Sequence, residues 1–479
     1  MKWIVTPLFA LVAGWQLAVA DAVPYAVGDV TSDSAVVWSR LPRAGAATLT
    51  FQARGEDPRN IRIDVSPDED LTAQYELNRL KPGTRYSFTL RFAPVGGVAR
   101  YVANGEFSTA PPANVPASVR LLWSGELSGQ NICRDADKGF PVFGAMLAVR
   151  PDLFVAAGDM IYADERCEET GRLGNRQVPL PDGPATDLAA FRSHWRYSRA
   201  DPQLRKFIAE VPYLPTWDDH EVRNNFGPGD DKFTPDGGTE TVGLMPLGRR
   251  VFLEHNPIRR HPVEPTRIYR DVRWGRHLHL FLLDTRQYRA PASAPDDGVE
   301  PKSMLGSAQR EWLLSTAGTS DATWRVIVSS VPLVIPTGPE NARDGWASGG
   351  GETGYSRELR AIIDDLRAAG ANNVLWLSAD VHYASFFRHQ IDEAYEVFEA
   401  VAGPLNARVV RREDFDTDLG TERLFIHPAT DGMTSFDAAL GAFNFGLVDI
   451  DASGQMVMRF LDARGETLWE VTMPVRSSR

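Results

Sequence analysis

Hydrophobic positions follow two different rhythms along the chain, and the rhythm changes near residue 110. Between 23 and about 110, short alternating runs at 35–38, 48–51 and 86–90 are separated by Gly, Pro and Asp turns. This spacing is typical of a β-sandwich and predicts an all-β domain over 23–110. A proline-rich segment at 111–117 predicts an extended linker.

After the linker, apolar strand candidates alternate with segments of helical periodicity. The strand candidates are 118–124, 153–157, 213–217, 278–283, 324–330 and 373–377, and the helical patterns are 188–210, 307–317 and 356–369. Strands that alternate with helices over this length favour an α/β domain in which helices cover a sheet. We therefore expect one α/β domain over 118–479.

Within the N-terminal sandwich, one tyrosine stands just after a Pro-Gly turn. Tyr86 closes the stretch LNRLKPGTRY at 77–86. This placement resembles the tyrosine corner of fibronectin type III-like sandwiches, in which the hydroxyl group bonds to the backbone a few residues upstream. Nothing else in this region has a catalytic character.

The polar residues of the α/β region gather directly after its strands. They are Glu126, Asp159, Asp218, Asp219, His220, Glu221, Asp284, Asp380 and His382. Ligands of α/β sheets bind outside the carboxyl ends of the strands. Carboxylates that converge there repel each other unless cations neutralise them. Each piece alone has a structural explanation, such as a turn or the acidic first turn of a helix, but the whole series predicts a metal site.

The first twenty residues have the pattern of a secretory signal peptide. One lysine precedes an apolar run that ends in Ala18-Val19-Ala20, and a membrane anchor is the alternative interpretation. We expect cleavage after Ala20, export from the cytoplasm, and no later segment with the ~20 apolar residues that a spanning helix needs. The two cysteines, Cys133 and Cys167, can pair in an oxidising compartment or remain apart, and both alternatives stay open.

Charge and motifs exclude several classes of function. The net charge is −12, and no basic run of five or more residues occurs, so a role in coating nucleic acid is not expected. Neither a nucleophile elbow nor a P-loop occurs in the sequence. The oligomeric state is not predicted by any of these features.

The sequence resembles a known family. The resemblance covers nearly the whole chain and rests on GDMIYAD (158–164), WDDHEVRNNF (217–226), LDTRQYR (283–289), MLGSAQREWL (304–313), SADVHY (378–383), AGPLNA (402–407) and FNFGLVDID (443–451). These motifs are similar to those of the PhoD-like alkaline phosphatases and phosphodiesterases, a branch of the calcineurin-like metallophosphoesterases. The resemblance implies a four-layer α/β fold, two sheets flanked by helices, and a binuclear metal site between the strand ends.

The resemblance also implies roles for individual residues. It makes Asp159 the bridging ligand of two metal ions, because one carboxylate has two oxygens. The other metal ligands that it implies are Tyr162, Asp219, Asp380 and His382. His220 becomes the general acid that protonates the departing oxygen. Arg223 and Asn225 stand near enough in the sequence to meet the phosphate, although Arg223 can equally pair with an acid.

One residue departs from the family pattern. Many relatives have a Cys or an Asp after the first strand, where this chain has Glu126. If Glu126 is a ligand, the site becomes harder and richer in oxygen. Oxygen ligands with a single histidine suit Ca²⁺ and Fe³⁺ better than zinc, and they permit Mn²⁺. We therefore expect one iron and one or two calcium ions.

Three hypotheses about function follow. The first is an exported phosphoesterase that cleaves phosphate monoesters or diesters with metal-activated water. The second is the same chemistry specialised for a larger substrate, such as a phospholipid headgroup. The third is a non-catalytic binding protein on the same fold, which Glu126 favours. The segments 164–187 and 228–248, rich in Gly, Pro and Asp, are candidates for shaping the substrate pocket.

Overall fold

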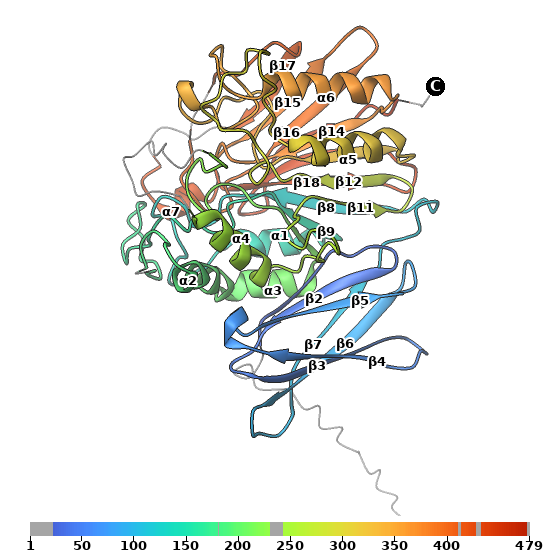
Figure 1. Cartoon of the computed structure of the whole chain (residues 1–479), viewed down its shortest axis with the longest axis vertical. Coiled ribbons are helices and arrows are strands. Elements are labelled where there is room, and N and C mark those ends of the chain that lie inside the picture. Colours follow the sequence, from blue (N-terminus) through green and yellow to red (C-terminus); the bar gives the residue numbers. More distant parts are fainter. Residues whose placement is uncertain (1–22, 181, 230–242, 411–412, 428–432, 477–479) are drawn as a thin grey trace, which may run out of the picture.

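The molecule is built around two β-sheets that pack face to face (Figure 1). The computed structural model describes residues 23–180, 182–229, 243–410, 413–427 and 433–476. The first sheet has the order β20 (Thr467–Thr472), β19 (Met456–Asp462), β18 (Asn444–Ile450), β8 (Val119–Ser124), β9 (Leu153–Ala156), β10 (Tyr213–Pro215), β1 (Tyr25–Gly28), β2 (Ser34–Arg40) and β5 (Thr72–Asn78). The second has the order β11 (Arg270–Trp274), β12 (Leu278–Leu282), β13 (Trp324–Val328), β14 (Val374–Ser378), β16 (Glu396–Val401), β15 (Ala384–Gln390) and β17 (Thr421–His427).

Helices cover the outer face of each sheet and complete four layers (Figure 1). The first sheet carries α1 (Val142–Ala148), α2 (Leu188–Arg199), α3 (Pro202–Glu210), α4 (Leu244–His255) and α7 (Phe436–Ala439). The second carries α5 (Gly306–Thr319) and α6 (Ser356–Ala368). Two 3₁₀ turns, Pro67–Glu69 and Glu340–Ala342, lie in connecting loops. The predicted four-layer α/β fold is confirmed.

The predicted strands and helices lie within a few residues of the observed ones, with one exception. The segment 188–210, predicted as a continuous helical pattern, is two helices, α2 and α3. Pro202 has no N–H for an interior helical hydrogen bond, so it starts a new helix instead. The side chain of Asp201 caps this helix, because its Oδ1 accepts hydrogen bonds from the N–H groups of Gln203 and Leu204 at 3.0 and 2.9 Å.

The N-terminal β-rich region is a sandwich whose one sheet is shared with the rest of the molecule. Its outer sheet has the order β4 (Arg59–Val65), β3 (Gly45–Ala53), β6 (Arg85–Pro94) and β7 (Arg100–Ser108). It faces β1, β2 and β5, and the hydroxyl oxygen of Tyr86 accepts a hydrogen bond from the Lys81 N–H at 2.8 Å, as the predicted tyrosine corner requires. Strand β1 pairs in parallel with β10, at Gly28 and Tyr213. The boundaries 23–110 and 118–479 stay predictions.

Asp70 links the sandwich to the helical layer. Its carboxylate accepts hydrogen bonds from Arg40 at 3.1 Å, from Arg196 at 2.8 Å and from His255 at 3.0 Å. The His255 ring is fully buried and stacks on Trp195, with 6.1 Å between ring centroids. Burial raises the pKa of Asp70, but the His255 and Arg40 hydrogen bonds outweigh it and lower the pKa well below its usual value. The ionised form is therefore part of the folded state.

Replacing this buried anion should destabilise the whole protein. Asp70→Asn keeps the side-chain shape and tolerates the left-handed backbone at this position (φ 49°), so it removes mainly the charge. Breaking a buried ion-pair network leaves its cations uncompensated, and we expect a loss of about 3 kcal/mol in the free energy of unfolding, measured by urea titration at pH 7. Asp64→Asn, whose carboxylate is 85% exposed, is the matched control and should change little.

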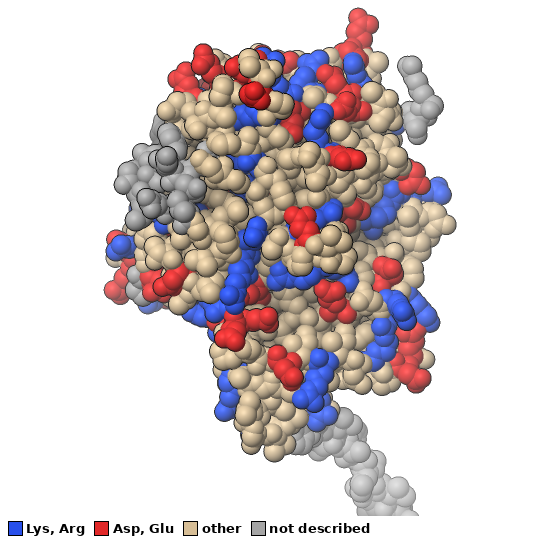
Figure 2. Space-filling model, viewed as in Figure 1, with Lys and Arg blue, Asp and Glu red and all other residues tan. Residues whose placement is uncertain are grey.

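The surface seen in Figure 2 mixes acidic and basic side chains, and a short group of basic ones lies near the middle of this face. Among the residues that the structure describes, no helix combines the length and the apolar character needed to cross a bilayer. The predicted signal peptide, 1–20, lies outside the described residues, as does most of the 228–248 segment.

Candidate metal centre

The predicted ligand residues come from loops that follow neighbouring parallel strands. Strands β8, β9 and β10 run parallel in one sheet, and β13, β14 and β16 run parallel in the other. Four of the predicted metal ligands have a left-handed backbone: Glu126 (φ 55°), Asp159 (54°), Asp380 (73°) and His382 (62°). Such a backbone costs about 1–3 kcal/mol for a non-glycine residue and persists only where other contacts fix it. Four of the predicted ligands therefore carry backbone strain.

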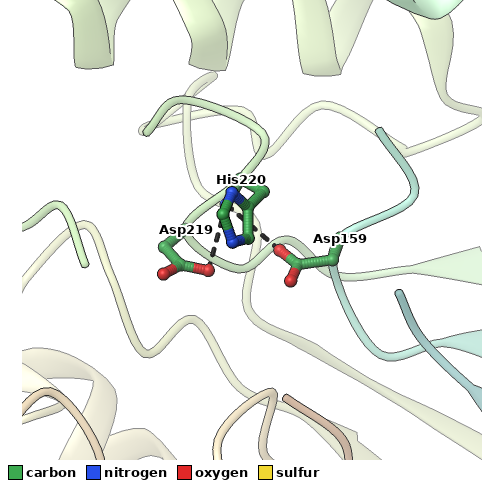
Figure 3. Close-up of side chains that lie close together, drawn as sticks. All are labelled: Asp159, Asp219 and His220. Carbon is green, nitrogen blue, oxygen red and sulfur yellow. Dashed lines mark hydrogen bonds between the residues drawn. The ribbon is translucent and has the colours of Figure 1, made fainter. Parts of the chain in front are cut away.

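Carboxylate oxygens from these loops form a tight cluster. Asp159, Asp218, Asp219 and Asp380 each offer an oxygen, and these atoms lie within 4.8 Å of one another. A ring nitrogen of His220 lies within the same distance of oxygens of Asp159 and Asp219 (Figure 3). Asp218 was not among the predicted ligands, because the resemblance assigned that role only to its neighbour Asp219. The cluster joins both sheets, since Asp380 follows β14 and the others follow β9 and β10.

These oxygens are buried without the partners that buried charges require. Glu126 Oε2, Asp159 Oδ2, Asp218 Oδ2 and Asp380 Oδ2 have no hydrogen-bond partner among the described residues. Glu126 joins the cluster through its Oε1, which accepts a hydrogen bond from the Asp380 N–H. Burying several unpaired carboxylates is strongly unfavourable unless a cation compensates them. The donor set therefore fits metal ions that prefer oxygen.

Glycine makes room for the longer side chain at position 126. A Cβ atom on Gly403 would lie 1.8 Å from Glu126 Oε2, and Gly403 has a φ of 137° that other residues rarely adopt. The glutamate thus occupies space that any other residue at 403 would fill. The fold therefore has room for the extra methylene of Glu126, and this side chain can reach the site.

Glu221 fastens two of the loops to each other. Its carboxylate accepts hydrogen bonds from the N–H groups of Asp159 (3.0 Å), Met160 (2.8 Å) and Asp218 (2.8 Å), and the residue is fully buried. Burial raises the pKa of Glu221 to about 7 in spite of these three donors. Its oxygens are occupied by backbone groups, so Glu221 orients the cluster and does not face it.

His220 is held as a charged group by its neighbours. Its Nδ1 lies 2.8 Å from Asp164 Oδ1, and its backbone N–H donates to Asp159 at 3.1 Å and to Asp219 at 3.0 Å (Figure 3). Burial lowers the pKa of His220, but the carboxylates of Asp164 and Asp219 outweigh it and raise the pKa well above its usual value. Because Nδ1 is bonded to Asp164, Nε2 is the ring nitrogen left to give a proton.

Tyr162 and His382 lie at the side of the cluster and contact each other. The Tyr162 hydroxyl lies 3.2 Å from His382 Nε2, and the Tyr162 ring stacks on His220 with 4.0 Å between centroids. His382 Nδ1 bonds to the carbonyl oxygen of Arg408, and burial lowers the pKa of His382 to about 4. A neutral histidine that donates through Nδ1 presents the Nε2 lone pair, the form that binds metals.

The remaining predicted residues lie on the loop that wraps Asp219. The Asn225 N–H donates to Asp219 Oδ2 at 2.6 Å, and the Arg223 N–H donates to the Asp219 carbonyl oxygen at 2.7 Å. These are backbone contacts, and a role of either side chain toward the phosphate stays a prediction. Cys133 and Cys167 form a disulfide, which joins the loop after Glu126 to the loop after Tyr162.

Three residues were not predicted in the roles that the structure shows. They are Asp164, Glu221, which links two loops, and Arg286. The guanidinium of Arg286 is fully buried, and its Nε donates to Asp218 Oδ1 at 2.6 Å while its Nη1 donates to Asp344 at 3.1 Å. Asp284, which was grouped with the polar strand ends, has a structural role, because its Oδ1 accepts from the Trp217 indole at 2.8 Å and from two backbone N–H groups. Each of these residues stands inside a motif, which was the available signal.

The buried carboxylates predict an unusual pH dependence for the metal-free protein. Burial raises the pKa of Glu126 to about 8, that of Glu221 to about 7 and that of Asp218 to about 6, whereas unfolded carboxyl groups titrate near 4. Between about pH 4 and pH 8 the folded state therefore binds more protons than the unfolded state, and stability falls as pH rises. We expect EDTA-treated protein to unfold at lower urea at pH 8 than at pH 5.5. Excess metal should reduce the difference, and equal midpoints without metal would contradict this account.

A cavity of about 640 Å³ lies away from this centre, between α4 and the N-terminal strands. Its charged lining is balanced between three acids and three arginines: Glu69, Glu76, Glu254, Arg249, Arg250 and Arg260. Several of these groups already pair with each other or with backbone oxygens, as Arg250 does with Glu254 at 2.9 Å. The candidate metal ligands lie in the carboxylate cluster and not in this cavity.

Comparisons with known proteins found several similar chains. Alkaline phosphatase D of Bacillus subtilis (strain 168) is 27% identical over 393 residues, which span 74% of this chain and 63% of that protein. The solved structure of PhoD matches with a TM-score of 0.72 at 20% identity and covers 94% of this chain and 88% of its own. The purple acid phosphatase PPD1 of yellow lupin (Lupinus luteus) matches with a TM-score of 0.64 at 13% identity, covering 94% and 73%.

At these identities the two solved structures establish the fold, a metallophosphoesterase fold with an N-terminal β-rich region. A family model described as PhoD-like phosphatase matches residues 121–459, which is most of the chain and includes the predicted site residues from Glu126 to His382. On this evidence, the chain belongs to the PhoD-like phosphatase family.

Proposed function

We propose that the protein is an exported, metal-dependent phosphoesterase that hydrolyses phosphate monoesters, diesters or both. The observation that carries the proposal is the cluster of buried carboxylate oxygens, which have no hydrogen-bond partners within the described ranges, beside a charge-paired histidine. The relative from B. subtilis is named an alkaline phosphatase and the lupin protein a purple acid phosphatase, which supports the same reaction class. The signal-like N-terminal sequence and the Cys133–Cys167 disulfide support export, since disulfides persist in oxidising compartments.

We assign metal binding to the predicted ligand set. Its members are Glu126, Asp159, Tyr162, Asp219, Asp380 and His382. Five of the six offer oxygen, and the phenolate of Tyr162 would suit a hard trivalent ion, so we propose Fe³⁺ with Ca²⁺ and keep Mn²⁺ as the alternative. Bound metal ions would supply electrostatic stabilisation of the phosphoryl oxygens and an activated water.

The chain's own residues supply the proton for the leaving group. His220 carries its charge near neutral pH because Asp164 and Asp219 raise its pKa, so it enters the reaction as an acid. Asp164 bonds to Nδ1 at 2.8 Å and fixes the ring, which leaves Nε2 as the nitrogen that gives the proton. Proton transfer from Nε2 to the departing alkoxide oxygen makes the leaving group neutral as its bond to phosphorus breaks.

Metal content and hydrolysis measured on the same preparation test the proposal. We expect mass spectrometry of purified protein to find iron and calcium, and we expect hydrolysis of p-nitrophenyl phosphate or bis-p-nitrophenyl phosphate. The ratio of the two rates separates a monoesterase from a specialised phosphodiesterase. If neither ester is cleaved after Ca²⁺, Fe³⁺ or Mn²⁺ is added and no metal is bound, the non-catalytic binding protein becomes the better hypothesis.

Removing the partner of His220 should shift the pH profile. Asp164→Asn keeps a hydrogen-bond acceptor near Nδ1 but removes the charge that raises the pKa of His220. The fraction of protonated His220 at high pH then falls, so the basic limb of kcat should move to lower pH, with a loss of about tenfold or more at pH 8. The measurement is kcat against pH at saturating metal. Asp182→Asn, on the same loop segment, is the control, and an unshifted limb would exclude His220 as the acid.

A further inference from the structure

Arg286 lies inside the carboxylate cluster and has no counterpart in the predicted ligand set. It follows β12, and its backbone N–H is held by Asp284 Oδ1 at 3.1 Å. Asp284 in turn accepts from the Trp217 indole, which precedes the Asp218–Asp219 pair. Two loops that are far apart in the sequence thus fix the guanidinium against this pair.

The guanidinium binds one oxygen of one carboxylate in the cluster. Asp218 Oδ1 accepts from Arg286 Nε at 2.6 Å and from Ser330 Oγ at 2.7 Å, so this oxygen is occupied by two donors. The third nitrogen, Nη2, lies 3.8 Å from Asp219 Oδ1. Asp159, Asp219 and Asp380 show no such side-chain cation within hydrogen-bond distance in the described part of the chain. Asp218 is therefore distinct from the other members of the cluster.

The charge of Arg286 is permanent. Burial disfavours a charged guanidinium, but Asp218, Asp219 and Asp344 outweigh it and hold the pKa well above its usual value. A fully buried cation with a fixed position changes how much further positive charge the surrounding carboxylates can accept. It acts on the same carboxylates as a bound metal ion but cannot be removed by a chelator.

We propose that Arg286 is a built-in cation of the metal centre, a positioning residue that keeps Asp218 as its own ion-pair partner and so limits the number of metal ions that the other carboxylates bind. The inference rests on the proposed metal-dependent function. Arg286 acts through Asp218 and touches no substrate in this account.

The first test measures metal stoichiometry. Metal-stripped protein is titrated with Ca²⁺ by calorimetry, and the bound ion is counted by mass spectrometry. Arg286→Met leaves Asp218 and Asp344 uncompensated, so we expect about one more Ca²⁺ per chain than in the wild type. Arg286→Lys keeps the charge and should keep the wild-type number. Arg310→Met, which removes an exposed ion pair with Asp365, is the matched control.

A second pair of variants carries the test if Arg286→Met does not fold. Asp218→Asn leaves Arg286 short of one counter-charge, so Ca²⁺ affinity should fall about tenfold or more. In Arg286→Met/Asp218→Asn the two changes compensate, and affinity should return close to the wild-type value. If affinity stays low in the double variant, Asp218 is itself a metal ligand and the inference is wrong.

The outcomes separate the inference from the function on which it rests. A wild type that binds no Ca²⁺, Fe³⁺ or Mn²⁺ overturns the proposed metal centre. A wild type that binds metal, together with an Arg286→Met variant of unchanged stoichiometry, overturns only the role of Arg286. Both readouts are independent of hydrolysis.

Discussion

His220→Ala should abolish most of the hydrolysis of unactivated phosphate esters while leaving the metal in place. General acid catalysis contributes about 10²–10⁴-fold, and its contribution grows as the leaving group becomes more basic. We expect a loss of about a thousandfold with an alkyl phosphate and a loss of only about tenfold with p-nitrophenyl phosphate, because nitrophenolate departs without a proton. The measurement is kcat for both esters with the metal content of each preparation.

The two esters distinguish the acid from a ligand. A ring nitrogen of His220 lies within 4.8 Å of the Asp159 and Asp219 oxygens, which is near enough for a role in metal binding. If the variant loses metal and both esters suffer equally, His220 is a ligand and the acid must be sought elsewhere. His261→Ala, a substitution outside the cluster, controls for contaminating phosphatase and for general damage.

Asp159→Asn should have the second large effect. It should reduce hydrolysis and metal affinity, and the sign of its effect on stability should depend on whether metal is bound. Asp159 is the proposed bridging ligand, and several kcal/mol of transition-state stabilisation depend on the bound ions. At about 1.4 kcal/mol per factor of ten, we expect hydrolysis to fall about a thousandfold or more, together with metal affinity. Both losses should appear in the same preparations.

Without metal, the same substitution should make the protein more stable. Burial and the neighbouring charge of Asp219 raise the pKa of Asp159 well above its usual value, so the folded metal-free protein resists ionisation at this position. Asparagine carries no charge and removes that cost at pH 8. Melting curves in EDTA should therefore rank the variant above the wild type, and curves in excess metal should reverse the order. Asp321→Asn, which is 89% exposed, should show neither effect, and a variant that is less stable in both conditions would contradict the proposed repulsion.

The layers of the fold follow from the sequence because they depend on local patterns. Buried parallel strands are short apolar runs, and their ends carry the polar residues, so the strands of the α/β region and the candidate site could be placed along the chain, while the two-sheet arrangement came from the family resemblance. The break between α2 and α3 was also readable, since Asp201-Pro202 is a capping residue followed by proline. However, the apolar periodicity continues across Asp201-Pro202, and for this reason 188–210 was predicted as one continuous helical pattern.

The contacts of the site could not be read in the same way. Asp164, Glu221 and Arg286 stand inside recognisable motifs, yet their roles depend on which loop each side chain meets. Glu221 bonds to Asp159 across 62 positions, and Arg286 to Asp218 across 68. Sequence spacing carries no information about such pairs. The sharing of a sheet between the sandwich and the α/β region was hidden for the same reason.

Because β1 pairs with β10, the N-terminal strands cover what would otherwise be an edge of the first sheet. A chain shortened to begin near residue 111 would lose β1, β2 and β5 and leave β10 with a bare row of N–H and C=O groups. An uncovered edge of this kind is a template on which a second copy can add its own strand. We therefore expect the shortened chain to self-associate through β10, so the sandwich cannot be treated as a detachable accessory when the protein is produced or redesigned.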